Sequence, residues 1–156
     1  MGGYGGASGK DQRKKDGCYY DSQKHKVKEK SSIIAAEYYL NLGMYIVFLH
    51  TGEKEGEGRP DLLVDYKLLV EVKGVVSLNP SQIAKQIKHA SKQISDELAR
   101  RLEDEQLPGK IVLISSHETL EIGFRLINAG YQEAKRKNQV HFQTEFWFNG
   151  EIKVLE

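Results

Sequence analysis

Two acidic side chains and one lysine stand at spacings that suit the hydrolysis of a phosphodiester. Asp61 follows Pro60 at the start of a short apolar run, and Glu71 and Lys73 lie in the next such run. If the turn between these runs takes residues 65–67, position 61 pairs with position 71, and directly opposed side chains lie roughly 5 Å apart. Two ionised carboxylates that close repel each other unless a cation lies between them. We therefore expect a cation site on this hairpin.

The chemistry of the donors favours a hard divalent cation. Carboxylate oxygens that leave room for water ligands suit Mg²⁺ best, with Mn²⁺ or Zn²⁺ as alternatives. Asp61 and Glu71 are the expected metal ligands, and the main-chain carbonyl of Val72 would complete the shell. Such an ion holds a scissile phosphate, polarises it and lowers the pKa of an attacking water.

Lys73 belongs to the same predicted site. It stands two residues after Glu71, so strand parity places both side chains on one face, while Val70 and Val72 point to the opposite face. An ammonium group there can neutralise the charge that develops in the transition state and orient the nucleophilic water. We expect Asp61, Glu71 and Lys73 to be catalytic residues.

Other polar residues each allow two interpretations. Glu37 lies close to the apolar edge of a predicted helix, where it is either a third catalytic and metal-side acid or a boundary side chain that curls to solvent. Gln82 and Lys85 either contact phosphate or the cleaved group, or belong to a solvated helix face. His50, His117 and His141 are scattered over the ends of different elements, so a metal-free mechanism would need two of them to converge.

The hydrophobic pattern predicts alternating helices and strands that can position this hairpin. The expected order is helix, three strands, helix, strand, helix and a C-terminal β-hairpin, which makes an α/β fold. Asn79 and Pro80 open the long helix as cap and first-turn proline, and Asn149-Gly150 marks the hairpin turn. The elements are predicted as a helix over Lys26–Leu42 ended by Gly43, strands over Met44–Leu49, Leu62–Val64, Leu68–Lys73 and Lys110–Ile114, a helix from Asn79 to Pro108-Gly109, a helix from Ser115 with Glu118 to Gly130, and the hairpin over Val140–Leu155.

Composition and charge set the broad class. At 156 residues the chain suits one domain, and its net charge of +1 indicates no global field that would attract a polyanion. The first 24 residues are rich in glycine and basic residues, so we expect a linker over 1–24 and a domain over 25–156. Cys18 has no internal disulfide partner, and no apolar run approaches the about 20 residues that span a bilayer. We expect a soluble protein without an export signal of its own.

The motif residues resemble a known family. With Glu37, Pro60-Asp61 and Glu71-Val72-Lys73, the span from about Lys26 to Ser116 resembles the PD-(D/E)xK nuclease superfamily. That resemblance implies a restriction-endonuclease-like αβββαβ core, with a mixed sheet flanked by helices. Within the superfamily, three stretches are similar to the C-terminal tRNase domains of contact-dependent growth-inhibition (CdiA-type) and other polymorphic toxins: Arg59–Asp65, Glu71–Lys73 and Gln82–Gln93.

The resemblance to toxin domains implies a function and partners. It implies metal-dependent cleavage of RNA, tRNA above all, in the cytoplasm of a target bacterium, and a cognate immunity protein that blocks the site. The domain would be delivered as the C-terminal part of a larger secreted or surface protein, and would be a monomer or a heterodimer with the immunity protein. Gly74, where a Ser or Thr is common, and the near-neutral charge depart from that pattern. Two alternatives stay open, a DNase of the same fold and a non-catalytic domain that binds nucleic acid or protein.

Overall fold

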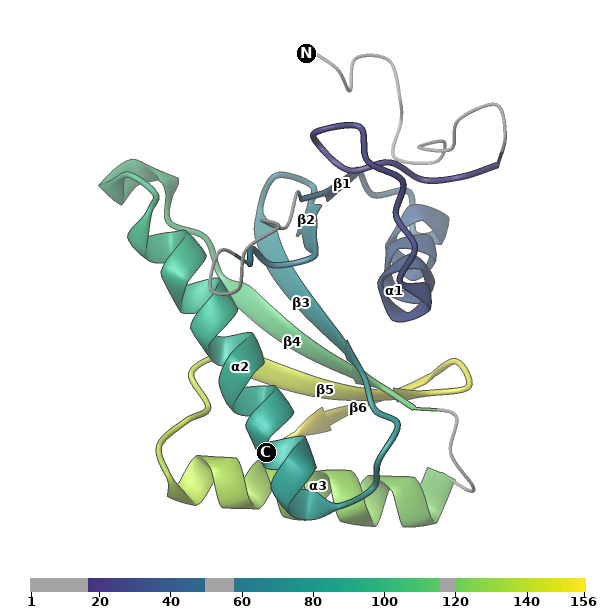
Figure 1. Cartoon of the computed structure of the whole chain (residues 1–156), viewed down its shortest axis with the longest axis vertical. Helices are drawn as coiled ribbons and strands as arrows, with labels where there is room; N and C mark the ends of the chain where they lie inside the picture. The colour runs from purple at the N-terminus through teal and green to yellow at the C-terminus, as the bar shows by residue number, and fades with distance from the viewer. Residues whose placement is uncertain (1–16, 50–57, 116–119) are drawn as a thin grey trace.

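The computed structural model describes residues 17–49, 58–115 and 120–156, which form an α/β fold (Figure 1). Within these residues, one six-stranded mixed sheet and three α-helices account for the regular structure, together with a short 3-10 helix, η1. The strands lie side by side in their chain order. The elements are α1 (Lys30–Asn41), β1 (Ile46–Phe48), β2 (Leu62–Val64), β3 (Leu68–Gly74), α2 (Pro80–Ala99), η1 (Glu103–Glu105), β4 (Gly109–Ile114), α3 (Leu120–Arg136), β5 (Gln143–Phe148) and β6 (Glu151–Leu155).

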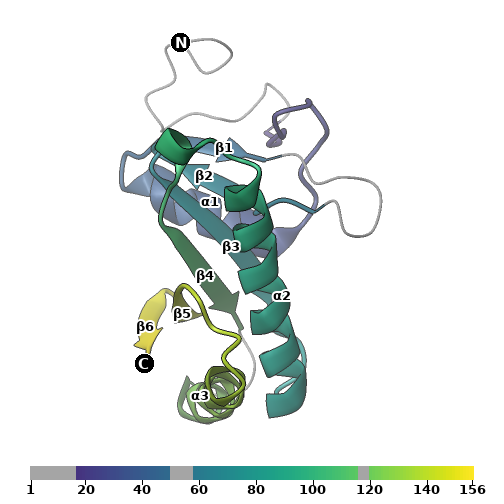
Figure 2. The same ribbon diagram turned by 90° about the vertical axis from the view of Figure 1, so that its left-hand side faces the viewer.

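The sheet is antiparallel at both ends and parallel in its centre. β1, β2 and β3 form an antiparallel meander, β3, β4 and β5 are parallel, and β6 returns antiparallel to β5. Parallel neighbours need a crossover connection, and α2 and α3 supply the two crossovers. Figure 2 shows α2 in front of the central strands and α1 behind them. The expected order of elements and the C-terminal hairpin are therefore confirmed.

Two apolar layers, one on each face of the sheet, hold these elements together. Beneath α1, the core includes the fully buried Val70 and Val72 of β3. On the other face, the buried isoleucines of α2 pack against β4 and α3. Val70 and Val72 thus lie on the face that strand parity predicts.

Several element ends follow local sequence signals. Gly43, with φ +83°, stands just beyond α1, where a left-handed residue ends a helix. The side chain of Asn79 accepts hydrogen bonds from two N–H groups in the first turn of α2, and Pro80 is the first helical residue. Asn149 and Gly150 both have positive φ, as the two-residue turn between β5 and β6 requires.

Two predicted helix ends are wrong because contacts with residues outside the helix decide them. α1 begins at Lys30 rather than Lys26, because Lys26 is held in a β-bridge with Tyr20. α2 ends at Ala99 rather than at residue 108. The side-chain amide of Gln106 donates hydrogen bonds to the carbonyl of Leu98 in the last turn and to those of Arg101 and Leu102 just beyond the helix.

The third helix differs from its predicted range as well. Its expected start at residues 115–118 lies largely outside the described residues, and Gly130 does not end it, since the helix continues to Arg136. Asn138, with φ +56°, follows its last turn, and the N–H of Gln139 donates to the carbonyl of Ala134 in a Schellman-type cap. Gly130 instead has a packing role. A Cβ on it would lie 2.6 Å from the Cβ of Ile83 and 2.9 Å from the carbonyl oxygen of Pro80 in α2.

Gly130→Ala should therefore destabilise the fold. A methyl group at that position forces α3 away from α2, and overpacking of this kind costs about 1–3 kcal/mol, more than the about 1 kcal/mol that alanine gains over glycine in a helix. Thermal unfolding of Gly130→Ala checks this, with Ala129→Leu as the control, because Ala129 is the exposed neighbour on the same helix. Equal melting temperatures for Gly130→Ala and wild type would contradict the packing role.

The folded unit includes residues ahead of position 25. Tyr19 is only 5% exposed and packs on Phe48, and Asp21 forms a parallel bridge with Phe48. Residues 17–24, which composition assigns to the linker, thus pack on the domain, while residues 1–16 lie outside the described part of the chain. Among the described residues, no helix is both long and apolar enough to cross a membrane.

Candidate active site

The β2–β3 hairpin brings the two predicted acids together. Its pairing runs from Val64 opposite Leu68 to Leu62 opposite Val70, so the same register places position 61 opposite position 71. Asp65 and Tyr66 both have positive φ, the sign that a tight type I′ hairpin turn requires. The turn thus occupies residues 65–67, as the sequence predicts.

Asp61 and Glu71 contact the same stretch of backbone. The N–H of Asp61 donates to Oε1 of Glu71 at 3.1 Å, and Oδ2 of Asp61 accepts from the N–H of Val72 at 2.8 Å. Because the N–H and C=O of one strand residue point to the same side, the carbonyl of Val72 points toward Asp61 as well. Two carboxyl groups and one main-chain carbonyl therefore lie close together at the start of β2.

Burial makes it costly for this pair to be fully ionised. Glu71 is 3% exposed, and desolvation raises the pKa of its carboxyl well above the ordinary range, with the charge of Asp61 acting in the same direction. Desolvation also raises the pKa of Asp61, although its hydrogen bonds with Glu71 and Val72 oppose the shift. A cation between the two carboxyl groups would stabilise their ionised forms.

Lys73 lies against Glu71 on the α2 side of the sheet. Its Nζ is 3.0 Å from Oε2 of Glu71 and donates a hydrogen bond to Oε1 of Gln93 at 2.9 Å. The side chain is 23% exposed, so the ammonium group sits at the boundary between the core and solvent. The ammonium group of Lys73 therefore already contacts Glu71, and Gln93 of α2 fixes the orientation of the lysine side chain.

Gln93 is a site residue that the motif does not reveal. Besides accepting from Lys73, its amide nitrogen stands 3.0 Å from where a Cβ on Gly58 would lie, so Gly58 allows its close approach to the chain just ahead of Asp61. Gln93 and Gln86, which are seven residues apart, lie on one face of α2. The side-chain amide of Gln86 donates a hydrogen bond to the carbonyl of Gly74. The seven-residue spacing alone places both glutamines on one face of the helix.

Glu37 is not brought to the acid pair. Its Oε2 accepts a hydrogen bond from the hydroxyl of Tyr19 at 3.1 Å, and its side chain lines a separate groove beside α1. In the part of the chain that the structure describes, no three His, Cys, Asp or Glu side chains gather closely enough to bind a metal without other donors. Glu37 as a third catalytic and metal-side acid stays a prediction.

Glu29 is the additional acid that acts on Asp61. It stands directly before α1, and its charge contributes to the raised pKa of Asp61. Glu29, Ser32 and Asp61 line one cavity of about 150 Å³. Residue spacing could not single out Glu29, because it precedes the helix and follows no helical pattern.

The two candidate substrate residues lie apart from the carboxyl groups. Lys85 lines a hollow between α2 and α3 together with Glu133 and Lys137. Gln82 is exposed in the first turn of α2, and within the described residues no hydrogen bond links its side chain to the acid pair. His141 is exposed after α3, whereas His50 and His117 lie outside the described residues.

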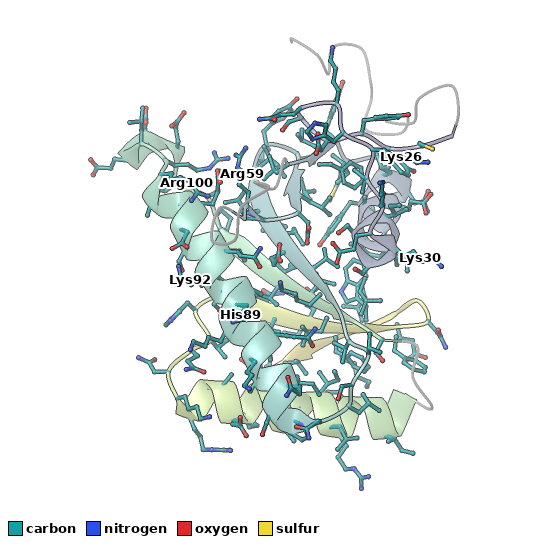
Figure 3. The ribbon with its side chains drawn as sticks, viewed as in Figure 1. Lys26, Lys30, Arg59, His89, Lys92 and Arg100 are labelled. Atoms are coloured by element: carbon teal, nitrogen blue, oxygen red, sulfur yellow. The ribbon has the colours of Figure 1, made fainter. Side chains whose placement is uncertain are left out.

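A buried ion pair anchors the chain that leads into Asp61. Arg59 donates from Nε and Nη2 to the two carboxylate oxygens of Glu97 at 2.8 and 2.9 Å. Glu97 is 3% exposed and also contacts Arg100 and Arg101, so the hydrogen bonds from Arg59 and the neighbouring positive charges lower its pKa to about 2. Figure 3 shows Arg59 and Arg100 at the same end of α2. This anchor fixes the position of Pro60 and Asp61 relative to α2.

The donor set fits a small hard cation. Two carboxylates and one carbonyl leave several coordination positions for water, which suits Mg²⁺, an ion that commonly keeps waters and takes one or two carboxylates from the protein. Burial raises the pKa of both acids, and a bound cation would oppose that shift. These observations are independent of any likeness to other proteins.

Comparisons with known proteins give no assignment. No family model matches this chain, and searches of the curated proteins and of the solved structures return no match. The functional interpretation therefore depends on the geometry of the hairpin and its surroundings.

Glu71→Gln should stabilise the metal-free protein at neutral pH. Because the pKa of Glu71 is raised in the folded state, its contribution to stability is present at low pH and is lost as the pH rises through that pKa. The amide stays neutral and avoids this loss. Thermal unfolding with EDTA should give a higher melting temperature for Glu71→Gln than for wild type at pH 7, and a smaller difference at pH 4. Mg²⁺ should stabilise wild type more than the variant, and the reverse order would count against the cation site.

Proposed function

We propose that this protein is a metal-dependent nuclease that hydrolyses phosphodiester bonds. The observation that carries the proposal is the close pair formed by the buried Glu71 of β3 and the half-buried Asp61 just before β2, with the ammonium group of Lys73 3.0 Å from Glu71. Solvated charges on an ordinary hairpin would be exposed and independent of one another. Here both acids have raised pKa values, which is typical of functional sites.

Asp61, Glu71 and the carbonyl of Val72 would hold the divalent ion. When bound, such an ion supplies charge that polarises the phosphate and makes a coordinated water more acidic. The protein's own contribution is to keep two carboxylates close together in a buried place, where electrostatic interactions are stronger than in water. The backbone N–H groups of Asp61 and Val72 hold these carboxylates in place.

Lys73 would stabilise the negative charge that grows on the phosphate oxygens. Its ammonium group is a compact charge with three donors, two of which are directed to Glu71 and Gln93. The third remains for a phosphate oxygen or a water. Gln93 acts as a positioning residue, because it holds Lys73 by one end of its amide and lies against Gly58 with the other.

RNA, and tRNA in particular, is the first substrate to test. This choice rests on the likeness of the stretches around Asp61, Glu71 and α2 to toxin tRNase domains, which also makes a blocking immunity protein and action in a target-cell cytoplasm part of the proposal. Incubation of the full chain with tRNA, total RNA or plasmid DNA, in Mg²⁺ or in EDTA, tests it directly. We expect tRNA cleavage in Mg²⁺ alone. Cleavage of plasmid with intact tRNA would instead assign a DNase, and binding without cleavage of either would assign a non-catalytic domain.

Gln93→Leu should reduce cleavage through Lys73. Without the amide oxygen, Lys73 keeps only Glu71 as its partner, and we expect kcat to fall on the order of tenfold with KM little changed, since small misplacements of a catalytic group cost that much or more. Steady-state kinetics against Gln132→Leu, a glutamine of α3, check the effect. A higher KM with unchanged kcat would show that Gln93 contacts the substrate and does not position Lys73.

A further inference from the structure

A wide groove lies on the α1 side of the sheet. It has a volume of about 820 Å³ and lies between α1, the chain after β3 and the tip of the β5–β6 hairpin. Figure 1 shows α1 and this hairpin tip on the same side of β3. Much of the lining is apolar. Three large hydrophobic residues of the lining are exposed to solvent: Ile34 at 50%, Tyr38 at 39% and Val76 at 81%. We call this surface the α1 groove.

The α1 groove adjoins the cavity that contains Asp61. Gly74, the residue after Lys73, lines it, and Glu29 lines both this groove and the cavity that contains Asp61. Lys30, labelled in Figure 3, stands at the start of α1 and also lines the groove. A ligand with a phosphate beside Asp61 can therefore extend past Glu29 into the α1 groove.

The chemistry of the lining suits a base better than a phosphate. Apolar side chains and the ring of Tyr38 offer flat surfaces, whereas Glu37, Glu151 and Asn149 present acceptors that would repel a phosphate or bind the amino and imino edges of a base. Tyr38 is held edge-on by Trp147, with ring centroids 4.8 Å apart, so its ring is already oriented. Bases stack on such aromatic side chains when they are unpaired, whereas in a duplex they are stacked on each other.

We propose that the α1 groove binds an unstacked nucleobase of the substrate, and that the protein therefore acts on single-stranded or looped nucleic acid rather than on duplex. This inference rests on the proposed nuclease function and specifies its substrate class. The base stacks on Tyr38 and packs against Val76, while the adjoining phosphate lies toward the cavity that contains Asp61. Duplex nucleic acid cannot place a base in the groove without breaking a pair.

Binding in Ca²⁺, in place of the catalytic ion, tests the groove separately from catalysis. Fluorescence anisotropy with one labelled oligonucleotide, single-stranded or annealed to its complement, should show tighter binding of the single strand to the full chain. Tyr38→Ala should weaken single-strand binding on the order of tenfold and leave duplex binding unchanged, since one base stack is lost. Tyr66→Ala is the matched control, because Tyr66 is 40% exposed at the β2–β3 turn against 39% for Tyr38.

A second variant covers the case in which Tyr38→Ala loses stability. Val76→Glu places a charge at an 81% exposed position, where it should not disturb folding, and should weaken single-strand binding too. Equal affinity for both nucleic-acid forms, with neither variant changing it, would overturn the groove proposal and assign the groove to another occupant such as a protein segment. Cleavage in Mg²⁺ would then still support the nuclease. Tyr38-dependent single-strand binding without any cleavage would support the groove and reject catalysis.

Discussion

Lys73→Met should lower the rate of phosphodiester cleavage about a thousandfold while the protein stays folded. Methionine keeps much of the length and apolar stem of lysine but removes the charge that faces the developing negative charge on the phosphate, and loss of one such group costs roughly 10²–10³ in kcat. The stem is 23% exposed and the ion pair with Glu71 is partly solvated, so the melting temperature should change little at acidic pH.

The same substitution should also alter the acid pair. Lys73 lowers the pKa of Glu71, so its removal raises that pKa further, and the metal-free variant should lose more stability than wild type as the pH rises. Rate measurements in Mg²⁺ on the preferred substrate check the catalytic role, with Lys137→Met as control because Lys137 is an exposed residue paired with Glu133. Asp61→Asn should be similarly inactive. Full activity in either Lys73→Met or Asp61→Asn would reject the proposed mechanism.

Glu97→Gln should cause the largest loss of stability among the single substitutions considered. The carboxylate is buried and contacts three arginines, which hold its pKa at about 2 against an ordinary value of 4.5; with a discount for the partial exposure of Arg59 and Arg100, this corresponds to about 2–3 kcal/mol. The amide keeps the shape but leaves Arg59, Arg100 and Arg101 without their shared anion. Since 1 kcal/mol shifts the melting temperature of a chain this size by about 2–4 °C, we expect a drop of roughly 5–10 °C.

The pH dependence of this effect has a definite sign. A carboxyl with a lowered folded-state pKa contributes stability above its ordinary pKa, and that contribution is lost as the pH falls from about 4.5 to about 2. The difference in unfolding free energy between wild type and Glu97→Gln should therefore be full at pH 7 and shrink across that interval. Asp61 and Glu71 respond in the opposite direction, but both proteins contain them, so their contribution cancels in the difference.

A matched exposed pair provides the control. Glu133→Gln breaks an ion pair with Lys137 at 3.5 Å whose side chains are 24% and 60% exposed, and such pairs contribute about 0–1 kcal/mol. Glu97→Gln should also reduce cleavage, because Arg59 no longer anchors the chain that leads into Asp61. If Glu97→Gln and Glu133→Gln melted at the same temperature, the ion pairs between Glu97 and the three arginines would contribute nothing to stability.

The hairpin could be predicted from the sequence because its determinants are local. A three-residue turn and the alternation of side chains along a strand suffice to place Asp61 opposite Glu71 and to put Lys73 on the face of Glu71. The caps at Asn79 and at Asn149-Gly150 are equally local, since each depends on the conformation of a few neighbouring residues. For the same reason the order of elements was correct.

Tertiary structure alone decided what surrounds that hairpin. The choice of Glu29 over Glu37 near Asp61, and of Gln93 over Gln82 and Lys85 beside Lys73, depends on how each helix is rotated and how far it is shifted along the sheet. Periodicity tells which side chains share a helix face, but the position of that face relative to a strand comes from packing of the whole core. Contacts such as that between Gly130 and Ile83 set this position, and no local pattern encodes them.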